Sequence, residues 1–260
     1  MKLKDKLWLW GQTEGSHHID DAFGLPAKSR MSPMEGAYYF GIKNMCRVVM
    51  RGLPALPFDQ DAMVLDTMDN VVWSIVGDSS CGLVDYTREI ARLAKIYTNI
   101  SGAIMDDVFR DSRLAHFTPE VISGYKKTLK ERAGRELPVW AVVYTNELLE
   151  NRRPYLAACD TLVMWTWKSE DLVKLEDNLA KLKALAPDKK IYVGCYMWDY
   201  GNKCEMSEEK MQLQLDTYYK WLKEEKVEGI VFGSNCCADL GLKASDMVRD
   251  FVRIHGDEEI

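Results

Sequence analysis

The sequence predicts a (β/α)8 barrel, in which parallel strands alternate with helices around a closed ring. Short apolar runs alternate with longer amphipathic segments eight times within 260 residues. No Pro/Gly/Ser-rich linker and no low-complexity stretch interrupts this alternation. An open doubly wound sheet shares the alternation, but eight repeats in about 250 residues fit a closed barrel better. We therefore expect residues 1–260 to form a single barrel domain.

The expected strands are short apolar runs, several of them rich in β-branched and aromatic residues. In chain order they are Leu7–Gly11, Cys46–Met50, Val71–Val76, Gly102–Met105, Val139–Tyr144, Thr161–Trp165, Ile191–Tyr196 and Gly229–Phe232. None contains a lysine. A Schiff-base aldolase needs a lysine inside a strand, so the sequence disfavours that class.

The expected helices carry periodic apolar positions, and several begin at a capping residue such as Ser32 or Ser207. In chain order they are Pro33–Asn44, Asp59–Met68, Asp85–Tyr97, Pro119–Arg132, Glu147–Ala158, Ser169–Leu185, Ser207–Glu225 and Ala244–Ile254. The turns that lead from a helix to the next strand are short, as at residues 135–138.

The long irregular segments all follow expected strands. They are Thr13–Ser32, Arg51–Phe58 and Trp198–Met206. In a barrel, the loops that follow the strands gather at the C-terminal face, where enzymes of this fold place their active sites. We therefore expect the functional site at this face.

Composition excludes several classes of partner. The formal net charge is -6, with acidic and basic residues interspersed, so nucleic acid is not expected as a partner. No apolar stretch approaches the roughly 20 residues of a membrane span. Met1–Lys6 is charged and leads into a short apolar patch, so we expect no signal peptide. This favours a cytoplasmic location for the chain as given, or a periplasmic or secreted one if a leader was removed.

The cysteines are seven in number and scattered, with no C-x-x-C spacing. This pattern favours reduced, buried thiols over a disulfide framework or a zinc site.

Two adjacent carboxylates, Asp106 and Asp107, end the fourth expected strand. A charged side chain that leaves water must be paired, hydrogen-bonded or neutralised. Strand alternation puts Asp106 in phase with Ile104 and Asp107 in phase with Met105, so at most one should face the same way as Ile104. The sequence leaves open which of them does. The ordinary structural interpretation is that one caps or salt-bridges a loop and the other is solvated.

The other strand ends bring aromatic and polar side chains to the same expected rim. They are Trp10, Gln12, Glu14, His17 and His18 after the first strand, Arg51 after the second, Asp78 after the third, Tyr144 and Glu147 from the fifth, Trp165 and Trp167 from the sixth, Tyr196, Trp198 and Asp199 from the seventh, and Asn235 from the eighth. Each aromatic residue alone fits the barrel core. Together they suit a sugar ring, which needs flat apolar platforms for its C–H faces and polar side chains for its hydroxyl edge.

Carboxylates in this setting suggest glycoside hydrolysis, in which one carboxyl group protonates the leaving oxygen and another acts as nucleophile or activates water. Asp106 or Asp107 is the first candidate, and the partner is Asp199 or Glu147, with Glu14 third. Glu147 also fits a helix cap. The expected hydroxyl ligands are Gln12, His18, Arg51 and Asn235, and the expected stacking platforms are Trp10, Trp165, Trp167, Trp198 and Tyr144.

Three motifs resemble those of poorly characterised, glycoside-hydrolase-like TIM barrels of bacteria. They are Trp-Leu-Trp-Gly-Gln at residues 8–12, Gly-Ala-Ile-Met-Asp-Asp-Val-Phe at residues 102–109 and Tyr-Met-Trp-Asp-Tyr-Gly at residues 196–201. The resemblance spans nearly the whole chain and implies an acidic residue at the end of the fourth strand, which Asp106 and Asp107 match. The chain departs from the best understood retaining group, because it has no Asn-Glu pair at the fourth strand and no Glu ending the seventh.

Alternative functions remain open at this stage. One is a non-catalytic carbohydrate-binding barrel that has lost a catalytic carboxylate. Another is a metal-dependent sugar isomerase with Asp106, Asp107 and His17 as ligands. A metal-dependent amidohydrolase is disfavoured because His17 and His18 are adjacent, and no Gly-x-Gly-x-x-Gly dinucleotide motif occurs. We expect a small-molecule or oligosaccharide substrate and no cofactor.

Overall fold

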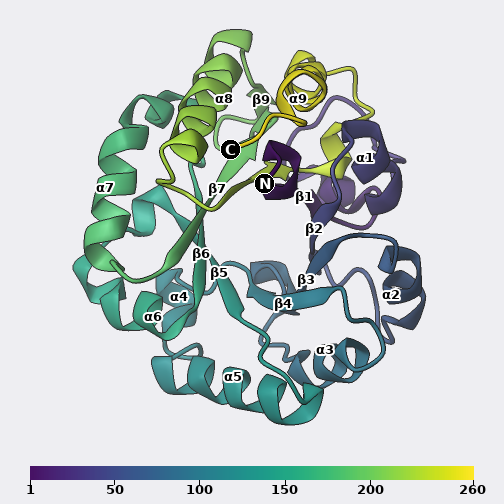
Figure 1. Cartoon of the computed structure of the whole chain (residues 1–260), viewed down its shortest axis with the longest axis vertical. Helices are drawn as coiled ribbons and strands as arrows, with labels where there is room; N and C mark the ends of the chain where they lie inside the picture. Colours follow the sequence, from purple (N-terminus) through teal and green to yellow (C-terminus); the bar gives the residue numbers. More distant parts are fainter.

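The computed structural model describes residues 1–260 and contains a closed parallel barrel, which confirms the predicted fold class (Figure 1). Its strands are β1 (Leu7–Gly11), β2 (Asn44–Arg47), β3 (Asn70–Val76), β4 (Ile100–Met105), β5 (Val139–Tyr144), β6 (Thr161–Trp165), β7 (Lys190–Tyr196) and β10 (Gly229–Gly233). The order around the ring is β1, β10, β7, β6, β5, β4, β3 and β2, and β1 pairs with both β10 and β2. Closure leaves no strand edge unpaired.

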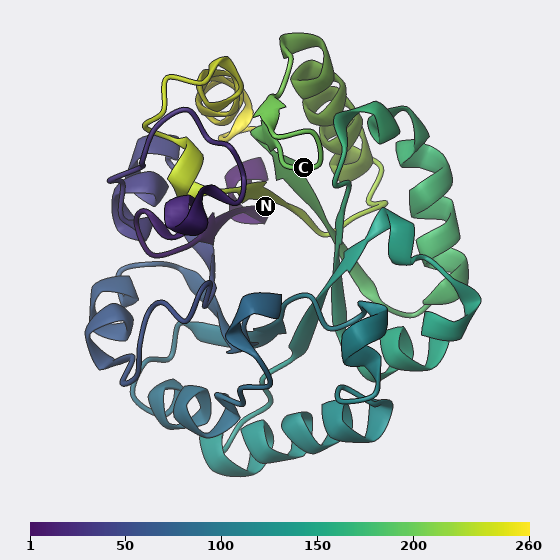
Figure 2. The same cartoon turned by 180° about the vertical axis from the view of Figure 1, so that it is seen from behind.

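Helices form the outer ring, which Figures 1 and 2 show from opposite sides. They are α1 (Pro33–Phe40), α2 (Asp59–Leu65), α3 (Thr87–Ala94), α5 (Pro119–Ala133), α6 (Arg153–Ala158), α7 (Leu175–Leu185), α8 (Glu208–Lys223) and α9 (Lys243–His255). A single extra turn, α4 (Asp111–Leu114), follows β4. None of these helices combines the length and the apolar character that a membrane crossing requires.

Several predicted boundaries are wrong for local reasons. The first helix ends at Phe40 and not at Asn44, because Gly41 adopts a left-handed conformation with φ 69° and caps it. The second strand begins and ends earlier than predicted, at Asn44–Arg47.

Two later predictions need a similar correction, and one element was not predicted. The segment from Glu147 forms short 3-10 turns before α6 starts at Arg153, and Ser169–Lys174 is likewise a 3-10 helix. The loop after β7 carries a small hairpin, β8 (Trp198–Asp199) with β9 (Cys204–Glu205).

Apolar side chains fill the barrel lumen. The buried cluster inside the ring consists of Trp8, Trp10, Cys46, Val48, Val72, Ile104, Trp140, Val142, Val163, Trp165 and Val231. Trp8 packs against Trp140 towards the N-terminal ends of the strands, with ring centroids 5.1 Å apart. Trp10 and Trp165 pack edge to face at 5.5 Å towards the C-terminal ends. The lumen is therefore a packed core, and its layer nearest the C-terminal ends of the strands forms a floor at that face.

The two ends of the chain meet at the N-terminal mouth of the barrel. The backbone N–H of Ile260 donates to the carbonyl oxygen of Met1 at 2.9 Å, and Lys2 forms an antiparallel bridge with Glu259. Asp257 forms ion pairs with Lys2 and Lys4 nearby.

All cysteines are free in the structure. Five are buried, whereas Cys81 is partly buried and Cys204 is exposed, so the prediction that these thiols are buried is wrong for Cys204.

Candidate functional site

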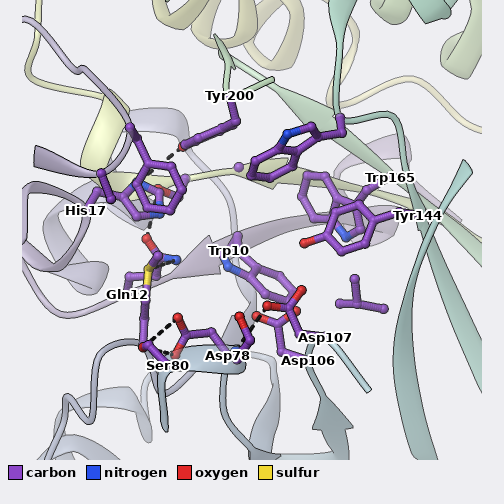
Figure 3. A pocket seen from close by; sticks show the side chains of 18 of the residues that line it. Trp10, Gln12, His17, Asp78, Ser80, Asp106, Asp107, Tyr144, Trp165 and Tyr200 are labelled. Carbon is purple, nitrogen blue, oxygen red and sulfur yellow. Dashed lines mark hydrogen bonds between the residues drawn. The ribbon is translucent and has the colours of Figure 1, made fainter. Parts of the chain in front are cut away.

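A cavity of about 400 Å³ opens at the C-terminal ends of the strands (Figure 3). Most of the expected site residues line it. They are Trp10, Gln12, His17, Arg51, Asp106, Asp107, Tyr144, Trp165, Trp167 and Tyr196. The position of this cavity agrees with the prediction that the long loops after the strands surround the site.

Two expected second carboxylates lie outside the cavity wall. Asp199 is 1% exposed and accepts hydrogen bonds from the backbone of Ser169 and from both the backbone and the side chain of Asn202. Burial acts to raise the pKa of Asp199, but these hydrogen bonds outweigh it and lower the pKa. Glu147 accepts the backbone N–H of Tyr144 at 3.0 Å and so caps the turn after β5. Both carboxylates are occupied in fixing loops.

The remaining expected ligands outside the wall hold the first loop in place or face away. Asn235 is fully buried and bonds to both the N–H and the carbonyl of Gln12 and to the carbonyl of Met31. Trp198 donates its indole N–H to the carbonyl of Phe23 at 3.0 Å, so it is not a stacking platform. His18 has both ring nitrogens buried and unpaired outside the wall, and Glu14 is exposed beside another cavity.

One side of the cavity, here named the carboxylate wall, consists of Asp78, Asp106 and Asp107. Ile104 belongs to the lumen cluster, and alternation along β4 therefore directs Asp106 upward into the cavity. Strand alternation allowed at most one of the two aspartates to face the same way as Ile104, and Asp107 lines the cavity as well. The backbone leaves the extended conformation at Asp107, where φ is 55°, and strand alternation no longer applies.

Asp106 has no ion pair, unlike Asp107, whose Oδ1 atom also lacks a hydrogen bond but lies 3.0 Å from the Arg110 guanidinium. Asp106 is 9% exposed, and its Oδ1 atom is buried without a hydrogen-bond partner. Burial, followed by the negative charges of Asp107 and Asp78, raises the pKa of Asp106 well above its ordinary value. A raised pKa favours the protonated form of this carboxyl group, which is the form that a general acid requires.

The other two carboxylates have donors around them. Asp107 accepts the backbone N–H of Ser79 at 3.0 Å and pairs with Arg110 at 3.0 Å. Asp78 accepts the Ser80 hydroxyl on both oxygens, at 2.7 and 2.8 Å, and the Cys81 thiol at 2.8 Å. These donors fix the orientation of both side chains.

Arg113 ties together the backbone segments that carry the carboxylate wall. Its guanidinium donates to the carbonyls of Gly77, Asp106 and Gly82 at 3.3, 3.3 and 2.9 Å. The side chain is 6% exposed, lies over the Phe117 ring and has no carboxylate within ion-pair distance. Arg113 therefore acts as a positioning residue for the ends of β3 and β4.

Five aromatic side chains from β5 to the loop after β7, here named the aromatic wall, continue the lining beyond the carboxylate wall. They are Tyr144, Trp165, Trp167, Tyr196 and Tyr200. Trp165 lies against Tyr196 with centroids 4.4 Å apart, and Trp167 stacks on Tyr200 at 5.7 Å. A β-carbon at Gly194 would stand 1.9 Å from the Trp165 ring, so only glycine leaves room for that indole. Trp165 is 2% exposed and thus forms floor, while Trp167 is only partly buried and can offer a ring to a ligand.

His17 lies on the side of the cavity away from the aspartates (Figure 3). Its Nδ1 atom is 3.2 Å from the Tyr200 hydroxyl. Burial, with a smaller contribution from His18, lowers the pKa of His17 to about 3, so the ring is neutral at physiological pH. No group of three or more His, Cys, Asp and Glu side chains is arranged to hold a metal ion. The structure therefore does not bring His17, Asp106 and Asp107 together as the ligand set of a sugar isomerase.

Some lining residues had no predicted role. They include Arg110, Tyr200, Phe23 and Ser80, and also Asp78, which was expected at the rim but given no role. Asp78 follows β3 as Asp106 follows β4, and that shared position was the available signal. Tyr200 reaches the cavity because the β8–β9 hairpin turns the chain back, which strand periodicity does not indicate.

The sequence has no match among family models, and no curated protein matches it. Solved structures share the fold at low identity. They include a glycoside hydrolase family 18 N-acetylglucosaminidase from Paenibacillus barengoltzii, with TM-score 0.56, 9% identity and coverage of 94% of this chain and 99% of that one. An amidohydrolase from Burkholderia multivorans has TM-score 0.54 and 12% identity, with 98% and 91% covered.

A glucosidase from Croceicoccus marinus has TM-score 0.51 and 11% identity, with 81% of this chain covered. The chain spans only 57% of that glucosidase's length. The chain therefore shares its barrel with glycoside hydrolases and with amidohydrolases, and likenesses at these identities concern the fold alone.

Proposed function

We propose that the protein is a carbohydrate-active hydrolase that cleaves a glycosidic bond held between the carboxylate wall and the aromatic wall. The observation that carries the proposal is Asp106, a buried carboxyl group with a raised pKa beside two further carboxylates in an aromatic-lined cavity. Protonated Asp106 is the general acid, which gives its proton to the leaving glycosidic oxygen.

Asp107 is the second carboxylate in this proposal. Arg110 and the backbone N–H of Ser79 hold it in one orientation, as a nucleophile or base requires. Asp78 is less suitable because hydrogen-bond donors already engage both of its oxygens. Trp167 offers its partly buried ring to the apolar face of the sugar, and the Gln12 amide can serve hydroxyl groups at the edge.

The test is hydrolysis of 4-nitrophenyl glycosides and reducing-sugar release from oligosaccharides, with variants Asp106→Asn and Asp107→Asn. Loss of a general acid costs roughly 10²- to 10⁴-fold in rate. The matched control is Asp177→Asn, an exposed aspartate on α7, which should keep full activity. Full activity in both cavity variants on a substrate that the wild type cleaves would rule the proposal out.

A second candidate function is a non-catalytic carbohydrate-binding barrel. One observation favours it: all three cavity carboxylates come from the ends of β3 and β4, and the aromatic wall supplies none. Paired carboxyl groups that flank a glycosidic bond are the common arrangement in hydrolases. Saccharide binding without turnover, unaffected by Asp106→Asn, would support this candidate over hydrolysis.

A further inference from the structure

Arg51 occupies a backbone position that suits other residues better. Met50 and Leu53 exchange two backbone hydrogen bonds, each 2.9 Å long, around Arg51 and Gly52. The two central residues have φ values of 54° and 74°, so the turn is of the primed type that favours Asn, Asp or Gly at its first central position. An arginine there is held in a left-handed conformation that costs free energy. An arginine at a turn position that favours Asn, Asp or Gly indicates that its side chain has a role elsewhere.

The side chain of Arg51 lines the cavity and is 24% exposed. The turn is fastened to the carboxylate wall, because the backbone N–H of Arg51 donates to Asp78 at 3.2 Å. The backbone of Arg51 is thereby fixed relative to Asp78 in the carboxylate wall.

The guanidinium of Arg51 has no buried ionic partner. Its one carboxylate neighbour is Asp20, 3.5 Å away and with a side chain that is 77% exposed, so solvent weakens this pair. Arg110 is the other arginine that lines the cavity. It pairs at 3.0 Å with Asp107, whose side chain is only 7% exposed. Arg51 is therefore the cavity cation that is available to a ligand.

A ligand anion can reach Arg51 without breaking a buried ion pair, because Asp20, the carboxylate partner of Arg51, is exposed. Asp107 is balanced by Arg110, and Asp78 is surrounded by the Ser80 hydroxyl, the Cys81 thiol and the Arg51 N–H. Burial and the neighbouring carboxylates raise the pKa of Asp106, which favours its neutral form. A planar guanidinium binds a carboxylate through two parallel hydrogen bonds, a geometry that a neutral hydroxyl cannot reproduce.

We propose that Arg51 recognises a carboxylate on the sugar, so that the ligands of this cavity are acidic saccharides, uronides in particular. This inference rests on the proposed function, because it assumes that a sugar occupies the cavity.

Calorimetric binding of matched methyl glycosides tests the inference. The probes are the methyl glycosides of glucuronic, galacturonic and mannuronic acid, each compared with the methyl glycoside of the neutral hexose. For the ring that fits, the uronide should bind about 10- to 100-fold more tightly, as for hydrogen bonds between charged groups. The preference should shrink as salt rises, because screening weakens the ion pair.

The decisive variant is Arg51→Asn, which suits the turn but lacks the charge. It should raise Tm by a few degrees, because backbone strain is relieved, and abolish the uronide preference. A structural role alone predicts a fall in Tm. The control is Asp20→Asn, which removes the exposed partner and should leave the preference intact.

Three results are distinguishable. A uronide preference that Arg51→Asn abolishes supports the inference. Equal binding of uronide and hexoside, or equal weakening of both by Arg51→Asn, overturns the inference but leaves the proposed function standing. If none of the glycosides binds, the proposed function and this inference both fail.

Discussion

The two walls of the cavity are built in different ways. The carboxylate wall depends on hydrogen bonds and irregular backbone, since Asp107 has a left-handed φ and Arg113 bridges the ends of β3 and β4 through carbonyls. The aromatic wall depends on packing, because Trp165 rests on Gly194 and against Tyr196. Polar positioning is sensitive to a single lost donor, whereas packed rings supply shape and are sensitive to added volume, as at Gly194.

Arg113→Met should have the largest effect, because it leaves the carbonyls of Gly77, Asp106 and Gly82 without their buried donor. Unpaired buried groups cost about 1–3 kcal/mol each, so we expect a loss of about 3 kcal/mol in the free energy of unfolding. Urea unfolding measures this change in the free energy of unfolding. Arg132→Met, at an exposed position of α5, is the control and should change stability by less than about 0.5 kcal/mol. A similarly small change for Arg113→Met would mean that the carboxylate wall does not depend on this arginine.

Asp106→Asn should stabilise the protein at neutral pH. The pKa of Asp106 is raised in the folded state, so the unfolded chain loses this proton first and stability falls as pH rises above the ordinary value of 3.8. The variant escapes this penalty, which is about 1.4 kcal/mol per unit of pKa difference. We expect a gain of at least ~1 kcal/mol at pH 7, measured by urea unfolding, that disappears near pH 3.

Asp199→Asn should act in the opposite direction, because hydrogen bonds lower the pKa of Asp199 and stabilise its ionised form. That stability is present above the ordinary pKa of 3.8 and is lost as pH falls below it. We expect the variant to lose about 1–2 kcal/mol at pH 7. Equal responses of the two variants across pH would contradict the different environments assigned to these aspartates.

Trp167→Ala should have the smallest effect. Trp167 is partly buried and contacts Tyr144, Tyr196 and Tyr200 through its ring. Removing this ring should weaken saccharide binding roughly two- to tenfold, because aromatic contacts contribute about 0.5–1.5 kcal/mol beyond their buried area. Titration by calorimetry measures the change, and Tyr38→Ala, at a residue 91% exposed on α1, is the control. Unchanged affinity would show that the aromatic wall serves packing alone.

The fold could be predicted from the sequence because the alternation of strands and helices is a local, repeated signal. The eight strand positions were correct to within a few residues. The largest shift is at β2, where Met50, a residue of the cavity, lies after the strand and not at its predicted end. Helix ends were less accurate where a special backbone conformation decides, as at Gly41. Such conformations depend on one residue and leave little trace in periodicity.

The candidate site was only partly predictable. Its cavity, Asp106, Asp107 and most aromatic residues followed from the rule that functional groups lie after the strands. Asp199 and Glu147 also follow strands, but they accept hydrogen bonds from Asn202 and from the Tyr144 backbone. The spacing of residues in the sequence does not reveal these contacts. Arg113 was missed because its role is to bind carbonyls, which every residue carries.

The meeting of Met1 and Ile260 at the N-terminal mouth has a practical consequence. The chain is nearly circular in space, so a short linker could join its ends and new termini could be opened in an exposed loop on the outer surface. Such a circular permutant would keep every strand neighbour of the ring. The same geometry puts both ends on the face opposite the cavity, so the protein can be immobilised through either terminus with its cavity directed towards the solution.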